Sequence, residues 1–238
     1  ANSHNSFKIS LNFLQKSISN NIFIEKSLKS SKCLYNNKKT PTKNLTLQFP
    51  CYSLVFGFNN ILLNDSSYRR DFIDSGLFHV EPSSQKLALS FAKALKQRNY
   101  LLKTKKNSNL DFWTKELIAA NSLFHESRDT YFQLLNTEFN NILESLRKEM
   151  PNLYDDISSI RMVFKKGWSN DYANLLVQNL DKDMSLGHTS AGTHRSDIEL
   201  TSKSKLVKES GSMSTLVLAC LIIYLAKIKK QYINNHLD

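Results

Sequence analysis

Apolar and polar residues alternate near the start of the chain. Phe7, Ile9, Leu11 and Phe13 are separated by single polar residues, and a period of two is typical of a strand with one buried face. Further short apolar runs follow, separated by polar turns. These runs lie at residues 22–24, 33–35, 45–49 and 52–56. We therefore predict an antiparallel sheet over residues 1–60.

The pattern becomes helical between Pro82 and Pro151. The 68 residues between these prolines contain neither glycine nor proline, which favours long helices. Two apolar stripes recur there at a spacing of three or four residues. The first comprises Leu87, Phe91, Ala94, Leu95, Leu101 and Leu102, and the second Trp113, Leu117, Ala120, Phe124, Tyr131, Leu135, Phe139, Ile142 and Leu146. We predict two amphipathic helices that pack on each other, the first capped by Ser83 or Ser84.

A single helix over residues 111–150 would be about 60 Å long at about 1.5 Å per residue. This exceeds what a compact domain of this size can cover, so we expect it to project as an arm. After the arm, the pattern predicts a strand at 160–164, a helix at 171–183, a loop at 187–197 and a strand at 198–200. The expected organisation is an α+β fold with a sheet portion at 1–81, a helical arm at 82–150 and a return to the sheet domain at 151–238.

Composition narrows the class of protein. The chain has 238 residues with 6 glycines and 4 prolines, which disfavours turn-dense all-β folds and glycine-rich phosphate loops. No P-loop or dinucleotide-binding pattern occurs. Three cysteines without a CxxC pair exclude a disulfide scaffold and a four-cysteine zinc site. A reducing, cytoplasmic location fits this cysteine usage.

The net charge of +11 is unevenly distributed. Residues 1–110 carry a net charge of +12 and residues 111–238 a net charge of −1. This asymmetry indicates a polyanionic partner such as nucleic acid, an anionic membrane surface, or an ordinary solvated face. No acidic residue lies between Glu81 and Asp111. The lysines of this stretch, which are the candidates for contact with DNA phosphates, are Lys86, Lys93, Lys96, Lys103, Lys105 and Lys106. Arg98 instead falls on the apolar stripe with Phe91 and Leu95, which indicates a buried ion pair.

One apolar run, at residues 216–226, could contact a membrane. Its 11 residues are fewer than the roughly 17 to 25 of a spanning helix, so we interpret it as a buried core helix and expect no membrane partner. A less favoured alternative is a peripheral membrane protein that uses this run and the lysines after it. The start of the chain has no apolar segment typical of a signal peptide.

Several segments resemble motifs of the bacterial RecF family of DNA replication and repair proteins. SYRRDFID at 67–74 resembles the family's RRxFLD element, and LKQRNYLL at 95–102 resembles its LKQRNxLL element. WTKEL at 113–117 and AGTHRSDI at 191–198 resemble two further elements, and a Gly-Trp pair stands at 167–168. They occur in the family's order. The matching motif residues are Arg69, Arg70, Asp74, Gln97, Arg98, Asn99, Gly192, His194, Arg195 and Asp197.

The resemblance implies an ABC-type, SMC-like ATPase head interrupted by an antiparallel helical arm. It implies a role in DNA replication, recombinational repair and the SOS response, with DNA binding that includes single-stranded DNA. In its complete form such a protein is an ATP-dependent DNA clamp that forms a homodimer around ATP and Mg²⁺. With RecO and RecR as partners, it helps to load RecA at gaps.

The resemblance also places the P-loop before residue 1 and the Walker B carboxylates after residue 238, so whether this chain is an enzyme is open. Residues 210–213 align with the family's S-R-G-Q signature and keep only the first serine. Ser210 is therefore the nucleotide-binding candidate, because a hydroxyl can donate to a phosphate, although binding of ATP by this chain is doubtful. The alternative is a non-enzymatic helical interaction module or an inactive remnant of a RecF gene.

Two pairs of motif residues have both a functional and a structural interpretation. Arg69 and Arg70 either contact DNA or the nucleotide-bearing head, or form salt bridges to Asp71 or Asp74. His194 and Arg195 either lie near nucleotide or stabilise a turn. We expect no metal site and no catalytic residue, because no histidine has further ligands at a suitable spacing and no nucleophile elbow surrounds Ser210.

Overall fold

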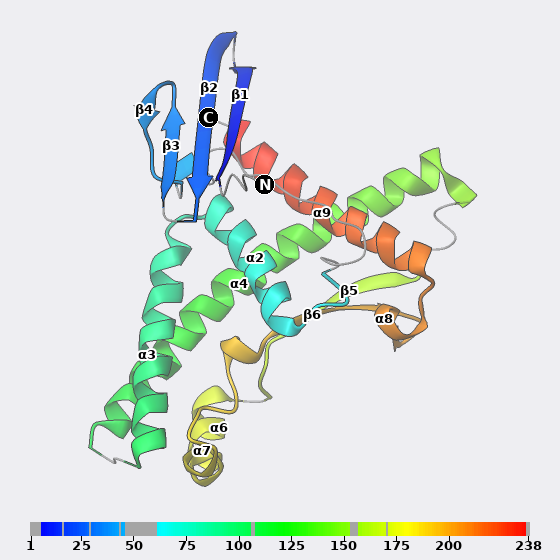
Figure 1. The fold of residues 1–238 in the computed structure, drawn as a ribbon. Coiled ribbons are helices and arrows are strands. Elements are labelled where there is room, and N and C mark those ends of the chain that lie inside the picture. The colour runs from blue at the N-terminus through cyan, green and yellow to red at the C-terminus, as the bar shows by residue number, and fades with distance from the viewer. Residues whose placement is uncertain are drawn as a thin grey trace, which may run out of the picture. The chain divides into compact units, whose positions relative to one another are not determined.

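In the computed structural model, the described residues are 6–15, 17–28, 30–42, 44–45, 61–105, 108–152, 157–169 and 171–236. The chain divides into two compact units, residues 1–54 (unit 1) and residues 55–238 (unit 2). Helices and antiparallel sheets are both present (Figure 1), and the predicted α+β class is confirmed.

Unit 1 contains a four-stranded antiparallel sheet in the order β1-β2-β3-β4. Its strands are β1 (Ser6–Gln15), β2 (Ile18–Ser27), β3 (Ser31–Tyr35) and β4 (Lys38–Lys39). Ile9 lies opposite Ile24 and Leu11 opposite Ile22, so the apolar residues of neighbouring strands share one face. The predicted sheet is confirmed for residues 6–39.

The core of unit 1 is small. Ile22, Cys33 and Leu45 are buried together, whereas Phe7 and Ile9 remain about half exposed. Leu45 is helical, so the predicted strand at 45–49 is wrong at its first residue. The rest of that run, and the run at 52–56, lie outside the described residues.

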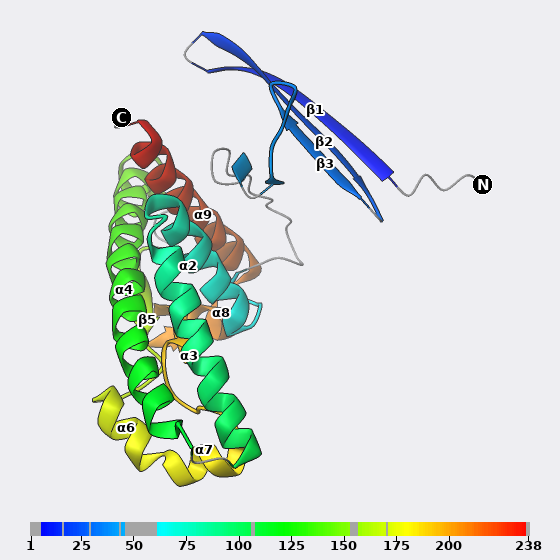
Figure 2. The same cartoon turned by 90° about the vertical axis from the view of Figure 1, so that its left-hand side faces the viewer.

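Four helices build most of unit 2. They are α2 (Ser66–Val80), α3 (Ser84–Thr104), α4 (Leu110–Glu149) and α9 (Met213–His236). The sequence pattern did not predict α2. Its N-cap is Asp65, whose carboxylate accepts a hydrogen bond from the Tyr68 N–H at 3.1 Å. Within unit 2, α4 packs against α3 and α9, and α2 contacts α3, α4 and α9 (Figure 2).

The cap predicted for α3 is wrong. Ser83 stands at the N-cap but already has helical backbone angles, and its hydroxyl bonds to the Glu81 carboxylate at 2.9 Å instead of a helix N–H. Ser84 is the first residue of the helix, and its buried hydroxyl makes no cap either.

The single long helix predicted after the polar connection is confirmed as α4, with 40 residues. Its first half packs on α3, where the rings of Phe91 and Phe124 lie 5.8 Å apart. Its second half packs on α9, where Lys229 pairs with Glu138 at 2.9 Å, and on the strand β5 (Ile160–Lys165). The second half is therefore covered and does not project, and the boundaries of the arm at 82–150 remain a prediction.

The second sheet of unit 2 is antiparallel, in the order β5-β6-β7. Its elements and the short helices around it are β5 (Ile160–Lys165), α6 (Tyr172–Gln178), α7 (Leu180–Leu186), η1 (Thr193–Arg195), β6 (Asp197–Ser202), β7 (Lys205–Leu206) and α8 (Val207–Ser210). The strands predicted at 160–164 and 198–200 are confirmed. The single helix predicted over 171–183 is wrong, because Asn179 ends α6 and caps α7, a position that suits asparagine better than a helix interior.

The apolar run at 216–226 forms a buried core helix within α9, as predicted. Leu216, Ala219, Ile222 and Ala226 are each 5% exposed or less. The lysine that follows is also buried: the Lys227 ammonium donates to the Phe72 carbonyl at 2.7 Å, so it does not face a membrane. No helix among the described residues is long and apolar enough to cross a bilayer.

Candidate functional site

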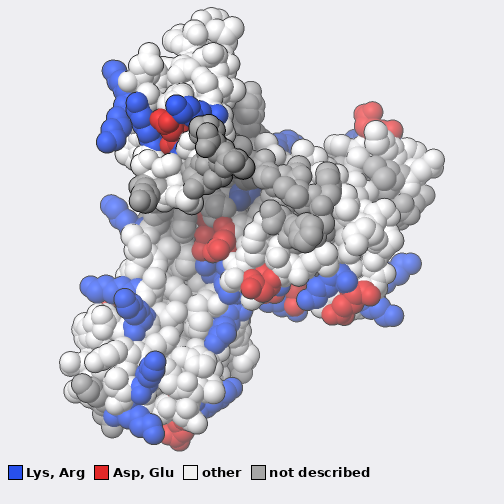
Figure 3. Space-filling view, in the orientation of Figure 1, with Lys and Arg blue, Asp and Glu red and all other residues white. Residues whose placement is uncertain are grey.

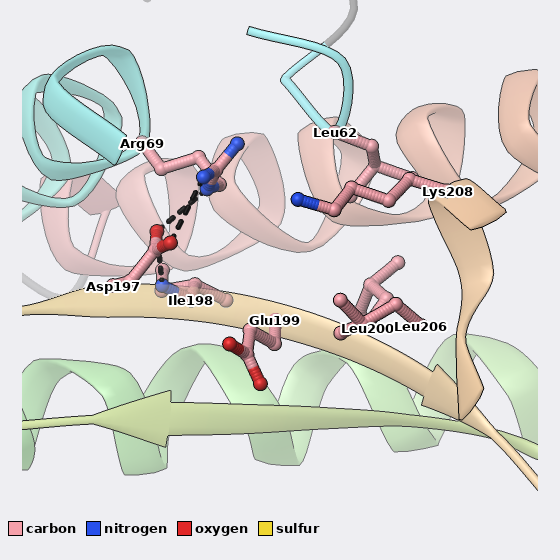
Figure 4. Close-up of a pocket in the computed structure, with 8 residues that line it drawn as sticks. All are labelled: Leu62, Arg69, Asp197, Ile198, Glu199, Leu200, Leu206 and Lys208. Atoms are coloured by element: carbon pink, nitrogen blue, oxygen red, sulfur yellow. Dashed lines mark hydrogen bonds and ion pairs between the residues drawn. The ribbon is translucent and has the colours of Figure 1, made fainter. Parts of the chain in front are cut away.

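Helix α2 brings the SYRRDFID segment against the AGTHRSDI segment. Arg69 is 6% exposed, and its Nε and Nη2 donate to the two carboxylate oxygens of Asp197 at 2.6 and 2.9 Å (Figure 4). Its Nη1 donates to the backbone carbonyls of Ile61 and Asn64. Burial favours the neutral guanidine, yet the bond to Asp197 dominates and raises the pKa of Arg69. Every nitrogen of this guanidinium is therefore engaged within the protein.

The predicted salt bridges from these arginines to Asp71 or Asp74 are wrong. Asp71 is exposed and lies two positions along α2 from Arg69, a spacing at which helix side chains do not face each other. Asp74 instead pairs with Arg128 of α4, at 2.7 Å from each of two guanidinium nitrogens.

Arg128 is a residue that the sequence analysis missed. Its Nη1 donates to the Thr193 carbonyl at 2.8 Å and to the Ser196 hydroxyl at 3.0 Å, so it joins α2, α4 and the turn η1. A signal was available: Arg128 follows Phe124 by four residues and precedes Tyr131 by three, which places it on the apolar stripe of α4. The same reasoning predicted a buried ion pair for Arg98.

That prediction for Arg98 is confirmed. Arg98 is fully buried, and its Nη1 donates to Asp183 at 2.8 Å and to Thr189 at 2.6 Å. Its neighbour Asn99 accepts a hydrogen bond from the Thr189 N–H at 2.8 Å. The LKQRNYLL segment thus anchors the loop that leads into AGTHRSDI, whereas Gln97 lies half-buried on α3.

The Gly-Trp pair meets the same loop. The Gly192 N–H donates to the Gly167 carbonyl at 3.3 Å, and both glycines have positive φ, +135° and +90°. A Cβ at Gly192 would stand 2.6 Å from the hydroxyl of Tyr172. Glycine at position 192 is therefore required both by backbone conformation and by close packing.

His194 lies beneath the turn and not on its surface. One ring nitrogen, Nε2, is 3.0 Å from the Thr189 carbonyl, which fixes Nε2 as the protonated nitrogen because a carbonyl only accepts. Burial lowers the pKa of His194 to about 4. The imidazole is therefore neutral at pH 7, and this geometry favours the turn-stabilising interpretation.

We expect His194 to make the stability of unit 2 sensitive to acid. Its folded pKa of about 4 lies below the model-peptide value of 6.5, so the unfolded chain takes up the proton first as pH falls. The free energy of unfolding should drop by about 2 kcal/mol between pH 7 and pH 5 because of this group. Urea titrations of the wild type and His194→Gln at both pH values test this, since the variant should lose about 2 kcal/mol less over the same interval.

His79 and His125 also have lowered pKa values because of burial. Both remain in the wild type and in the variant, so the difference between the two proteins isolates His194. An equal drop in the two proteins would contradict the assignment.

Known proteins were compared with this chain. No protein-family model matches it. The DNA replication and repair protein RecF of Shewanella sediminis (strain HAW-EB3) is 31% identical over 181 residues, which are 74% of this chain and 48% of the relative. RecF of Shewanella baltica (strain OS223) is 31% identical over 183 residues, with the same shares of the two chains. The chain is RecF-like.

Solved RecF structures share its fold. The recombination mediator protein RecF–ATP of the RecFOR pathway superposes with a TM-score of 0.71 at 16% identity, covering 96% of this chain and 64% of that one. The ABC-ATPase-like fold expected from the resemblance is therefore confirmed. The RecF-like chain spans about half the length of the curated relatives it matches.

The lysine row is the most basic surface of the RecF-like chain that the sequence singled out. Lys86, Lys93, Lys96 and Lys103 are exposed on α3, and at about 100° per residue they fall within roughly 100° of the helix circumference. The row is about 25 Å long at about 1.5 Å per residue. Figure 3 shows basic side chains along the α3 side of the molecule. Lys105 is exposed at the end of α3, and Lys106 lies outside the described residues.

The nucleotide candidate Ser210 is exposed at the end of α8, where its hydroxyl donates to the Leu206 carbonyl at 3.0 Å. Arg69, Asp197, Leu206 and Lys208 help to line a nearby cavity of about 20 Å³ (Figure 4). This is enough for one water molecule and far below the roughly 300 Å³ at which ligand pockets begin. These residues by themselves do not fit ATP.

The described residues also offer no cluster of ligands for Mg²⁺ or zinc. Across residues 61–105, 108–152 and the other described ranges, no group of three or more His, Cys, Asp or Glu side chains could hold a metal ion.

Proposed function

We propose that this RecF-like chain is the DNA-binding part of a protein of DNA replication and recombinational repair, and that it contacts nucleic-acid phosphates through the lysine row on α3. The observation that carries this proposal is the row itself: four exposed lysines on one helix face, in a stretch without acidic residues. Such contacts hold the backbone and do not read bases.

The wider role follows from the relatives and is part of the same proposal. In its complete form the protein would be a cytoplasmic, ATP-dependent clamp that dimerises around ATP and Mg²⁺ and acts in the SOS response. Its partners would be RecO and RecR, and it would help to load RecA at gaps. The solved structure of the recombination mediator protein RecF–ATP supports, for that protein, ATP binding and a place in the RecFOR pathway. Single-stranded and gapped DNA are the substrates to test first.

Neutralising the row should weaken DNA binding and reduce its dependence on salt. We expect the triple variant Lys93→Gln, Lys96→Gln, Lys103→Gln to lower the slope of log K against log salt concentration by about 2 to 3, because each lost phosphate contact removes about 0.7 to 0.9. Fluorescence anisotropy with labelled gapped and single-stranded oligonucleotides over a series of salt concentrations measures this slope.

The matched control removes three exposed lysines that lie elsewhere: Lys148→Gln, Lys203→Gln and Lys205→Gln. It changes the net charge equally and should leave most of the slope in place. An equal decrease of the slope in both variants would show that only the net charge matters, and it would reject the lysine row as the DNA-binding surface. No binding by the wild type would reject the proposed function and favour a helical interaction module.

A further inference from the structure

Six charged groups meet where α2, α4 and η1 come together. Four are arginines and two are carboxylates: Arg69, Arg70, Arg128, Arg195, Asp74 and Asp197. Each carboxylate forms an ion pair with one arginine. Arg69 binds Asp197 and Arg128 binds Asp74, each through two N–H···O bonds. Arg70 and Arg195 form no ion pair among the described residues, and Arg70 is only attracted at longer range by Asp197 and Asp65.

Arg70 is held in place with most of its donors unused. Its Nη1 donates to the Ser196 carbonyl at 2.9 Å, and within the described part of the chain its Nε and Nη2 have no partner. The closest acidic residue along the chain before it, Asp65, uses its carboxylate on the Ser67 hydroxyl and the Tyr68 N–H. Burial, followed by the positive charges of Arg128 and Arg195, lowers the pKa of Arg70, and the negative charges of Asp197 and Asp65 oppose this shift in part.

Arg195 stands beside Arg70 on a rigid turn. It directly precedes Ser196, whose carbonyl holds Arg70, and it is exposed at the end of η1. The turn is fixed from behind, because the Thr193 N–H donates to the Asn121 side chain at 2.8 Å and the Arg195 N–H donates to the Gly192 carbonyl at 2.8 Å. Among the described residues, Arg195 forms no ion pair.

The positive charges of Arg70 and Arg195 repel each other, and an anion bound between the two guanidinium groups relieves this repulsion. Guanidinium forks match the oxygens of a phosphate group. The cavity behind them, lined by Arg69, Arg70, Arg128 and Asp197 among others, is only about 10 Å³, so a phosphate can be met only from the solvent side, where Arg195 is exposed.

We propose that Arg70 and Arg195 form a phosphate-binding site at the junction of α2 and η1, and that its ligand is a phosphodiester of the nucleic-acid backbone. The assignment to nucleic acid rests on the proposed function, whereas the phosphate chemistry does not. The site uses no lysine of the row on α3. Arg69 and Arg128 are positioning residues, because they hold Asp197, Asp74 and the turn in place.

The first experiment tests the phosphate site without DNA. Inorganic pyrophosphate is titrated into the full 238-residue chain, and the thermal midpoint of unfolding is followed for the wild type, Arg70→Gln and Arg195→Gln. We expect pyrophosphate to raise the midpoint of the wild type and to leave both variants unchanged, because a ligand that binds only the folded state stabilises it. The same rise in all three proteins would overturn the site.

The second experiment tests the nucleic-acid assignment. Each single variant should bind a labelled single-stranded oligonucleotide roughly tenfold more weakly, and the double variant only slightly more weakly than either, because both arginines hold one phosphate. Arg70→Lys should recover only part of the loss. Arg147→Gln, an exposed arginine that pairs with Glu144 on α4, is the matched control and should bind as the wild type does.

The outcomes separate the two proposals. If the wild type binds the oligonucleotide and both variants bind it equally well, the nucleic-acid assignment is rejected while the proposed function stands. If the wild type does not bind the oligonucleotide but shows the arginine-dependent response to pyrophosphate, the proposed function fails and the phosphate site remains. A response to ATP that is stronger than to pyrophosphate, without competition by oligonucleotide, would assign the site to free nucleotide and contradict the phosphodiester.

Discussion

Replacing Asp183 by asparagine is expected to lower the free energy of unfolding of unit 2 by about 3 to 5 kcal/mol. Asp183 and Arg98 are both fully buried and lie 2.8 Å apart. Asparagine keeps the shape of the side chain and removes its charge, so the guanidinium is left uncompensated inside the protein. The other Asp183 oxygen accepts the Ser190 N–H at 2.9 Å, and this bond can survive in the amide.

Urea denaturation at neutral pH measures the loss. The matched control is Asp181→Asn, an exposed residue of the same helix α7, for which a change within about 0.5 kcal/mol is expected. A second variant removes both charges: Arg98→Met with Asp183→Leu should cost less than Asp183→Asn, since no charge is left unpaired. Equal effects of Asp183→Asn and Asp181→Asn would show that the buried pair does not matter for stability.

The second large effect is expected at Gly76, in the middle of α2. A Cβ added there would stand 2.0 Å from the hydroxyl oxygen of Tyr131 and 2.5 Å from the ring carbon that bears it. Tyr131 is 1% exposed on α4, so a movement of its ring would disturb the close-packed core around it. Helix propensity alone would make Gly76→Ala stabilising by about 1 kcal/mol, whereas the overlap should make it destabilising by about 3 kcal/mol. The sign of the change in the free energy of unfolding therefore shows whether helix propensity or steric overlap dominates at this position.

A double-mutant cycle identifies the cause. Gly76→Ala should cost much less when Tyr131 is also replaced by alanine, because the overlapping atoms are then gone. Ser90→Ala, at an exposed position of α3, serves as the control for helix propensity and should change stability by less than about 0.5 kcal/mol. The prediction is wrong if Gly76→Ala is neutral or stabilising in the wild-type background.

The sequence predicted those features that depend on local spacing. Alternation placed the strands of residues 6–39, and three-four spacing placed α3, α4 and the buried Arg98. Arg128 obeys the same rule and was still missed, because the stripe was defined by apolar residues alone and passes from Phe124 to Tyr131. The pairing of Arg69 was wrong for another reason: its partner Asp197 is 128 residues away, and helix geometry constrains only partners within a few residues.

Motif resemblance gave information that spacing could not. It grouped residues of α2, α3 and η1, and the structure brings many of them to one junction. It did not distinguish the residues that hold the turn, such as Arg69 and Asn99, from those that form no ion pair among the described residues, such as Arg70 and Arg195. That distinction requires the hydrogen-bond partners, because it depends on which donors the fold has already used.

The two halves of α4 pack on different elements, and this affects how unit 2 unfolds. Its first half is packed by α3 and its second half by α9 and β5, and it contains no glycine or proline at which it could break. Local opening of either half weakens the support of the other half, so the centre of α4 is stabilised by both sets of contacts. We therefore expect the amides at the centre of α4 to exchange with solvent more slowly than those at its two ends.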